Sequence, residues 1–155
     1  MNKPIRRKSE AAKRTLPRRS RYVLDEQVGF LLRVAMQRHT AIFMSRMIED
    51  LTQTQFAALA RLFAVGPCSQ NQLARLIYLD AATTKGVVDR LEARRLVVVC
   101  PDPHDRRRRA IALTKAGRAI AVKAMRVARG ITRETLRPLS GAEEKAVLRL
   151  LKKLI

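Results

Sequence analysis

Glycine and proline are scarce in this 155-residue chain, which has six of each, whereas 47% of its residues are hydrophobic. This composition excludes a fibrous or a fully disordered protein. The length is that of one domain whose core can fold without metals or disulfides, and it argues against a multidomain enzyme.

Cysteines and long apolar runs are scarce as well. Cys68 and Cys100 are far apart and belong to no CxxC motif or ligand cluster, which favours reduced thiols and no metal site. No segment approaches the roughly 18 consecutive apolar residues of a membrane span, and the basic N-terminus lacks the apolar stretch of a secretory signal. We therefore expect a soluble cytoplasmic protein with no cofactor and no membrane partner.

Acidic residues are also few. The chain has 13 Asp and Glu against 33 Lys and Arg, so its formal net charge is +20 at pH 7. Such a charge attracts polyanions at diffusional encounter, which makes nucleic acid the leading candidate partner. The basic residues are dense in residues 1–21, where we predict a flexible N-terminal arm. Two roles stay open for the arm: it contacts DNA, or it is a solvated tail that aids solubility.

Helical periodicity dominates the first two thirds of the chain. Apolar residues recur at helical spacing over residues 23–50, which predicts one long helix. The next three helices are predicted to begin after residues that favour N-caps, namely Thr52, Ser69 and Asp80. The last of these spans residues 81–93.

The periodicity then changes. Residues 96–100 and 110–113 are apolar and β-branched, and the turn residues between them predict a β-hairpin. A helix capped by Thr114 follows over residues 115–137, and Ser140 begins the last helix. We therefore predict a mainly α fold with a small β-hairpin wing, which is the element order of a winged helix-turn-helix.

Four segments follow from this order: the arm, a dimerisation and effector helix at residues 22–50, a winged DNA-binding lobe at residues 51–113, and C-terminal dimerisation helices at residues 114–155. A single winged helix reads few base pairs, so a palindromic operator in double-stranded DNA requires a symmetric homodimer. The first and last helices are too apolar to leave in water, although they could instead pack within one chain.

The predicted recognition helix, residues 81–93, carries polar residues where DNA contacts are expected. Thr83, Thr84 and Lys85 occupy its N-terminal turn, which normally points at base edges, and Arg90 lies within reach of a phosphate. Ser69 could offer its hydroxyl and backbone N–H to another phosphate. Alternatively, the threonines only cap or pack and Lys85 is solvated.

The hairpin tip is the most basic short segment of the chain. Asp105 is followed by Arg106, Arg107, Arg108 and Arg109, whose mutual repulsion phosphates would relieve. A narrow minor groove accepts one inserted Arg, and Asp105 is better explained as an intramolecular partner that orients an Arg. A solvated charged loop is the alternative.

Six short motifs follow one another between residues 51 and 117. They are Leu51-Thr52-Gln53-Thr54-Gln55-Phe56, Gln72-Leu73-Ala74, Asp80-Ala81-Ala82-Thr83-Thr84, Val88-Asp89-Arg90-Leu91-Glu92, Asp102-Pro103-His104-Asp105-Arg106-Arg107 and Leu113-Thr114-Lys115-Ala116-Gly117. Together they resemble the MarR family of bacterial transcriptional regulators. The family's Asp-x-Arg wing motif matches Asp105 and Arg107, so the resemblance selects Arg107 as the minor-groove residue. Arg94-Arg95 departs from the pattern, because many relatives have a Gly there that closes the recognition helix.

Four further segments are similar to the MarR subgroup that represses nicotinate catabolism genes. They are Gly29-Phe30, Gln37-Arg38-His39-Thr40-Ala41-Ile42-Phe43, and Thr54-Gln55-Phe56-Ala57-Ala58-Leu59 with Gly66-Pro67-Cys68-Ser69-Gln70-Asn71-Gln72-Leu73. In this subgroup a hydroxylated nicotinic acid releases the protein from DNA. The resemblance therefore implies a small aromatic carboxylic acid as effector.

Candidate effector residues lie near the first helix. His39 is on its apolar stripe with Arg38 beside it, and a cation at the edge of an apolar interface suits a carboxylate. Tyr22, Phe43 and Phe63 could supply the walls. Alternatively, His39 is a hydrogen-bonded core residue and the aromatic side chains are plain core.

An enzyme is not expected, because the sequence has no phosphate-binding Gly loop, no nucleophile elbow and no isolated carboxylate pair. The interpretation that fits best is a sequence-specific transcriptional regulator, a repressor released from its operator by an aromatic acid. Two alternatives stay open: a non-specific architectural nucleic-acid-binding protein, and a MarR-type regulator that senses oxidants through a cysteine.

Overall fold

The computed structural model describes residues 22–102, 105 and 107–155, so the predicted arm, residues 1–21, and Arg106 lie outside the described residues. The described elements, in chain order, are a 3-10 helix η1 (Leu24–Glu26), α1 (Val28–Arg46), α2 (Gln53–Val65), α3 (Gln70–Leu76), α4 (Ala81–Ala93), β1 (Val97–Pro101), β2 (Arg109–Leu113), α5 (Lys115–Leu136) and α6 (Gly141–Leu151). The predicted fold class, mainly α with a small β-hairpin, is confirmed.

From α2 onward, the predicted helix starts agree with the structure because the expected caps form. The hydroxyls of Thr52 and Ser140 accept hydrogen bonds from backbone N–H groups three residues on, and both caps are reciprocal capping boxes. Ser69, Asp80 and Thr114 cap α3, α4 and α5 in the same way, without the reciprocal bond. Each cap satisfies a backbone donor that the helix leaves unpaired.

The first helix is shorter than predicted. The chain forms η1, passes through an extended Gln27 and only then enters α1, which ends at Arg46 rather than near residue 50. Glu49 and Asp50 have φ values of 56° and 47°, a left-handed conformation that a helix cannot continue through. This turn directs the chain into α2.

We call α2, α3, α4, β1 and β2 the winged lobe. The strands pair antiparallel, with Val97 opposite Leu113 and Pro101 opposite Arg109. Cys68 adds a short bridge to the outer side of β2 through two backbone hydrogen bonds with Ile111. The turn before β1 forms with Arg95 at a φ of 57°, so the left-handed residue that closes α4 is not a glycine here.

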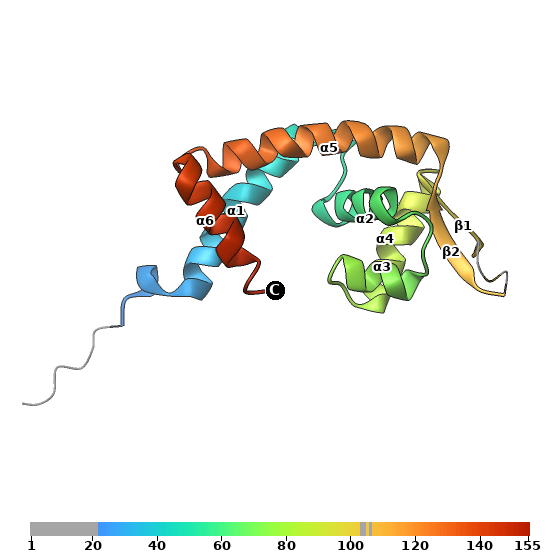
Figure 1. Ribbon diagram of the computed structural model, residues 1–155, viewed down its shortest axis with the longest axis horizontal. Coiled ribbons are helices and arrows are strands. Elements are labelled where there is room, and N and C mark those ends of the chain that lie inside the picture. Colours follow the sequence, from blue (N-terminus) through green and yellow to red (C-terminus); the bar gives the residue numbers. More distant parts are fainter. Residues whose placement is uncertain (1–21, 103–104, 106) are drawn as a thin grey trace, which may run out of the picture.

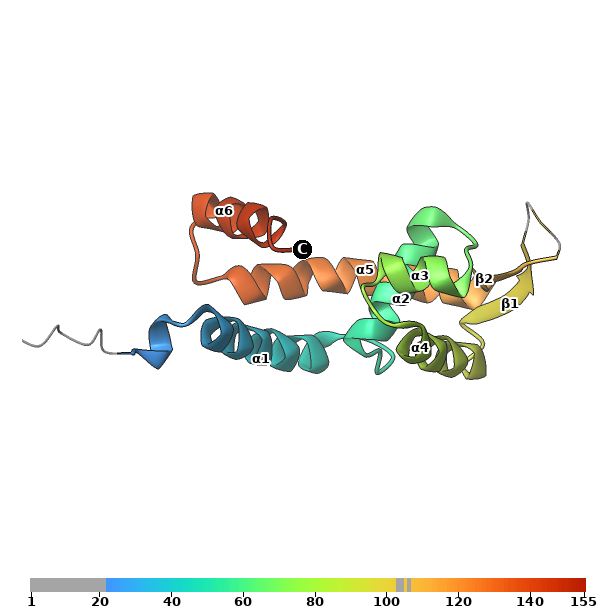
Figure 2. The ribbon, with the colours of Figure 1, turned by 90° about the horizontal axis from the view of Figure 1, so that it is seen from below.

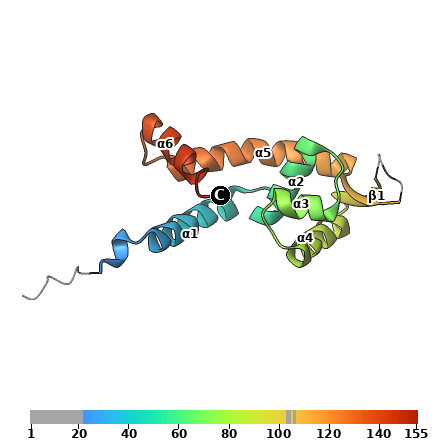
Figure 3. The ribbon, with the colours of Figure 1, turned by 60° about the horizontal axis from the view of Figure 1, so that its bottom comes forward.

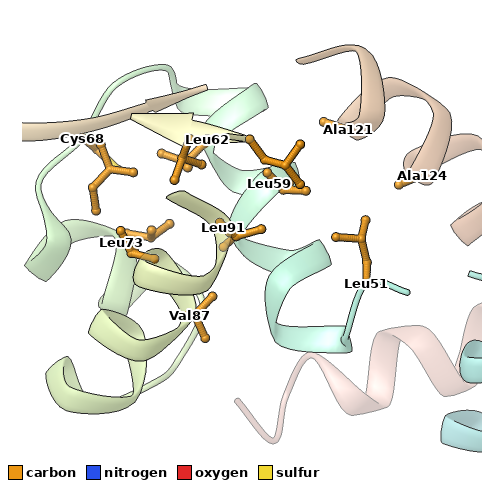
Figure 4. Packing of buried hydrophobic residues seen from close by; sticks show 14 residues of the cluster. Leu51, Leu59, Leu62, Cys68, Leu73, Val87, Leu91, Ala121 and Ala124 are labelled. Carbon is orange, nitrogen blue, oxygen red and sulfur yellow. The ribbon is translucent and has the colours of Figure 1, made fainter. Parts of the chain in front are cut away.

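The hydrophobic core lies inside the winged lobe and reaches the first half of α5 (Figure 4). Leu59, Leu73 and Leu91, from α2, α3 and α4, are completely buried, and Ala121 and Ala124 bring α5 onto the same cluster. These are large apolar side chains from every helix of the lobe, so each helix is held by the others.

The helix α5 joins the lobe through a backbone contact. A Cβ on Gly117 would lie 1.8 Å from the carbonyl oxygen of Leu96, so only glycine lets α5 approach the start of β1 this closely. Thr114 strengthens this junction, since its hydroxyl donates to the carbonyl of Arg95 at 2.8 Å.

Figure 1 shows α5 running across the molecule, from the winged lobe at one end to α1 and α6 at the other. We call α1, α6 and the C-terminal half of α5 the helical end. Seen from below, α1 and α6 lie on opposite sides of α5 (Figure 2). The helical end buries little: Phe43 is the buried residue of α1, and α6 has none.

Candidate nucleic-acid interface and ligand cavity

The N-terminus of α4 is exposed and held by Asp80. The carboxylate of Asp80 accepts the backbone N–H of Thr83 at 2.8 Å and its hydroxyl at 2.6 Å. These hydrogen bonds lower the pKa of Asp80 below its ordinary value, the side-chain bond being the larger cause. Lys85 is exposed one residue beyond this cap region and pairs with Asp89 at 2.6 Å. The exposed face of this turn therefore presents Thr83 and Lys85.

Thr84 does not belong to that face. Its side chain is completely buried, and its hydroxyl donates to the backbone carbonyl of Asp80 at 2.8 Å. It shares its buried face with Val87, Val88 and Leu91. The prediction that Thr84 contacts DNA is therefore contradicted, because successive residues of an α-helix lie 100° apart around its axis, and this rotation turns Thr84 toward the core.

Two further predicted DNA contacts lie at the edge of the same surface. Arg90 is exposed, and its guanidinium lies along the space above Gly86, 3.5 Å from where a Cβ would be. Ser69 is half-buried and caps α3 by accepting the N–H of Gln72. The side chain of Gln70 donates to the carbonyl of Ala81 at 3.2 Å and so ties the start of α3 to the start of α4.

The wing tip is organised by Asp105. Its carboxylate accepts the backbone N–H of Arg107 at 3.0 Å and pairs with the Nε of Arg108 at 3.3 Å. Asp105 is thus an intramolecular partner, as expected, and its ionic partner is Arg108. Among the described residues, the guanidinium of Arg107 has no carboxylate partner, and it projects from the tip as an exposed cation.

A cavity of about 270 Å³ lies where α1, α2 and α5 meet. His39 is at its edge and is hydrogen-bonded through Nδ1 to the hydroxyl of Thr135 at 2.9 Å. The ring of Phe43 lies 6.4 Å from His39 and 6.0 Å from Phe56, centroid to centroid. The lining residues are Met36, His39, Phe43, Gln53, Phe56, Ala128, Ile131 and Thr132.

A second cavity of about 350 Å³ continues from the first between α1, α5 and α6. Met36, His39 and Thr132 line both cavities, so the imidazole stands between them. The walls of the second cavity are almost wholly apolar and include Leu148 and Leu151 of α6. Sequence reasoning missed Phe56 and Met36, although Phe56 opens the apolar face of α2 directly after the Thr52 cap.

Three predicted effector residues lie elsewhere. Tyr22 is 72% exposed and lines neither cavity, because η1 and Gln27 separate it from α1. Phe63 lies on the winged-lobe side of α2, where the guanidinium of Arg118 covers its ring at 5.2 Å. Arg38 donates to the carbonyls of Thr135 and Glu134 at 2.7 and 3.3 Å. Its guanidinium thus satisfies the C-terminal carbonyls of α5 rather than facing a cavity.

Cys68 is poorly suited to redox chemistry. It is buried in the core, and burial raises the pKa of its thiol, which disfavours the reactive thiolate. In the part of the chain that the structure describes, no three His, Cys, Asp or Glu residues are grouped as metal ligands. No helix among the described residues is long and apolar enough to cross a membrane.

Comparison with known proteins agrees with this architecture. The model of the MarR family matches residues 49–108, and the chain is 44% identical to the HTH-type transcriptional repressor NicR of Pseudomonas putida over 86% of its own length and 85% of NicR. The chain belongs to the MarR family. Its element order and hairpin are those of the winged helix-turn-helix proteins in this family.

Two solved MarR-family structures are similar over the same region. A crystal structure of a probable transcriptional regulator from Pseudomonas aeruginosa is 49% identical, with a TM-score of 0.81, and covers 86% of this chain and 100% of that one. BpsR of Bordetella bronchiseptica, whose DNA binding is regulated by 6-hydroxynicotinic acid, is 42% identical with a TM-score of 0.80. The shared region is 86% of this chain and 96% of BpsR.

Proposed function

We propose that this protein is a homodimeric, operator-specific repressor that a hydroxylated nicotinic acid releases from DNA. The observation that carries the proposal is the cavity beside His39, which adjoins both the winged lobe and α5 in a MarR-family chain. Its similarity to BpsR, which 6-hydroxynicotinic acid regulates, supports the choice of ligand.

Operator recognition would use two parts of the winged lobe. Thr83 and Lys85 would face base edges in the major groove, and Arg90 and Ser69 would contact phosphates. Arg107 would enter the adjacent minor groove, for which an exposed guanidinium with no carboxylate partner in the described part of the chain is suited. Arg108, held by Asp105, would lie near the backbone.

The dimer would form through the helical end. Leu31 and Leu32 of α1 and Leu148 and Leu151 of α6 are between 42% and 51% exposed in the single chain. An apolar surface of this kind is rarely left in water. Two copies that bury it against each other would place two winged lobes on the two halves of a palindrome.

The effector carboxylate would bind at His39, and its ring would lie in the cavity against Phe43 and Phe56. Binding there would compete with the hydrogen bond between the imidazole of His39 and the hydroxyl of Thr135, which links α1 to the end of α5. Since α5 also carries the winged lobe, a ligand that shifts α1 against α5 changes the spacing of the two recognition helices. The ligand thus favours the conformation that does not match the operator.

The test is a gel-shift titration on the DNA upstream of the protein's own gene, at fixed salt with excess random competitor. The wild-type protein should bind specifically and be released by 6-hydroxynicotinic acid, with nicotinate and salicylate as comparison ligands. His39→Ala should keep operator affinity and lose most of the ligand response. Tyr22→Ala, at the exposed position outside the cavities, should respond like the wild type.

Other outcomes would choose among the alternatives. Equal affinity for operator and random duplex would favour an architectural protein. Release by peroxide that Cys68→Ser or Cys100→Ser abolishes would favour oxidant sensing. A normal ligand response in His39→Ala would contradict the assigned cavity.

A further inference from the structure

The outer face of α5 carries a row of basic side chains that operator recognition does not use. It consists of Lys123, Arg126, Arg129 and Arg133, which we call the α5 basic row. Their spacing of three, three and four residues places them on one face of the helix. All four are exposed, and no ion pair joins any of them to a carboxylate within the described part of the chain.

This face points away from the rest of the protein. The buried residues of α5, among them Ala121, Ala124 and Ile131, lie on the opposite side of the helix. On that side α5 packs against α1 and α2, and α2 lies between α5 and the helices α3 and α4 (Figure 3). The α5 basic row is therefore on a different face from α4.

Like charges at these spacings repel each other and destabilise a helix. Glu134, the sole acidic residue of α5, does not offset this repulsion, because its carboxylate pairs with Arg46 and Arg137 rather than with the α5 basic row. No large hydrophobic residue of α5 is exposed. A protein interface normally has an apolar core, and a membrane-surface helix needs apolar side chains, so neither partner suits this face. A face that presents arginine side chains and little apolar surface suits phosphate groups, because the guanidinium matches the geometry of phosphate oxygens.

We propose that the α5 basic row binds the sugar-phosphate backbone of a second DNA duplex, so that the protein bridges two DNA segments. From Lys123 to Arg133 the row rises by ten helical steps, or about 15 Å, which is about 4 base pairs of B-DNA. The exposed apolar residues that call for a dimer partner lie on α1 and α6, so the row stays in solvent in such a dimer.

The test is co-capture of a second duplex. Full-length protein is bound at saturation to bead-linked operator DNA, and a fluorescent duplex of random sequence is added at several salt concentrations. Wild-type protein should retain the second duplex in a salt-sensitive manner. Arg126→Gln, Arg129→Gln and Arg133→Gln combined should weaken retention at least about tenfold and reduce its salt slope by about 2 to 3.

A matched triple variant controls for net charge. Arg149→Gln, Lys152→Gln and Lys153→Gln remove three equally exposed charges near the C-terminus and should retain the second duplex like the wild type. Affinity for a single operator duplex, measured separately, should be within about threefold in all three proteins, because none of these residues is on α4 or the wing.

No retention by the wild type, or equal retention by the two triple variants, would overturn the proposal. Failure of the proposed function would look different: operator and random duplex would bind alike in the single-duplex assay. Retention of the second duplex could still be measured in that case, because that duplex has a random sequence and its binding does not depend on operator specificity.

Discussion

The winged lobe and the helical end differ in where their apolar side chains lie. In the winged lobe, Leu59, Leu73 and Leu91 are completely buried by neighbouring helices of the same chain. In the helical end, α6 buries no residue, and Leu150 is 52% exposed. The winged lobe contains a complete hydrophobic core, whereas the helical end exposes an apolar surface that a second copy of the chain would bury.

The same two regions differ in how polar groups are used. At the wing tip Asp105 pairs with Arg108, while Arg107 is exposed and has no carboxylate partner among the described residues. At the helical end, Arg38 is already committed to the carbonyls at the end of α5. Arg107 is therefore better placed than Arg38 to bind a ligand.

The largest effect is expected where the two regions join. Gly117→Ala places a methyl group 1.8 Å from the backbone carbonyl of Leu96, which cannot move without disrupting β1, so we expect a loss of more than about 4 kcal/mol of stability. Urea unfolding followed by circular dichroism measures it. Gly130→Ala is the control, because a Cβ at that position would meet no atom within 4 Å. This substitution should stabilise α5 by about 0.5–1 kcal/mol. Equal stability of the two variants would refute this account.

Breaking the helical end alone should separate dimerisation from folding. Leu148→Asp combined with Leu151→Asp should give a monomer in sedimentation analysis whose winged lobe still folds, with operator affinity reduced about 100-fold because two half-sites are no longer joined. Val65→Asp, at a similarly exposed apolar position in the winged lobe, should stay dimeric. A dimeric double variant would contradict the interface.

Within the winged lobe, the two arginines of the wing tip should differ. Arg107→Ala should weaken operator binding by about 1–3 kcal/mol and relax preference for the base pairs under the wing. Arg108→Ala should weaken binding less and uniformly across sequences, because Arg108 is paired with Asp105. Gel shifts at fixed salt on operator and mutated operators measure both. The reverse order would mean that the wing contacts DNA through Arg108.

The smallest effect concerns acid stability. Hydrogen bonds from Thr83 lower the pKa of Asp80 below 3.8, and those from Ser140 lower the pKa of Glu143 below 4.5. Each cap therefore stabilises the fold above the ordinary pKa and is lost as the pH falls through the lowered one. In each of the variants Asp80→Asn and Glu143→Gln, the melting temperature should fall slightly less than in the wild type as the pH is lowered through the acidic range. If both variants show the same dependence of melting temperature on acidic pH as the wild type, neither cap contributes to the pH dependence of stability.

Much of this architecture could be predicted because its determinants are local. Caps such as Thr52 and Asp80 act within one turn, and the change from helical to β-branched patterning located the hairpin. The end of α1 escaped prediction, because the left-handed Glu49 and Asp50 follow from the packing of Leu51 into the core rather than from a turn motif.

The candidate site could be predicted only in part. Arg107, Lys85 and His39 were expected to bind and are accessible, whereas Thr84 differs from Thr83 only in which side of α4 it occupies. The cavity needed residues from three helices, so Phe56 could not be assigned to it from spacing alone.

Sequence by itself determined the helix starts from α2 onward, the hairpin, the charge and the family, because hydrogen-bonding caps, side-chain periodicity and ionisation are properties of neighbouring residues. Tertiary structure decided which cations are free and which are occupied. The guanidinium of Arg38 donates to backbone carbonyls of α5, 96 and 97 residues away in the chain, while no carboxylate within the described residues pairs with the α5 basic row. The reason is that an acceptor far away in the chain reaches a side chain only after the helices have packed.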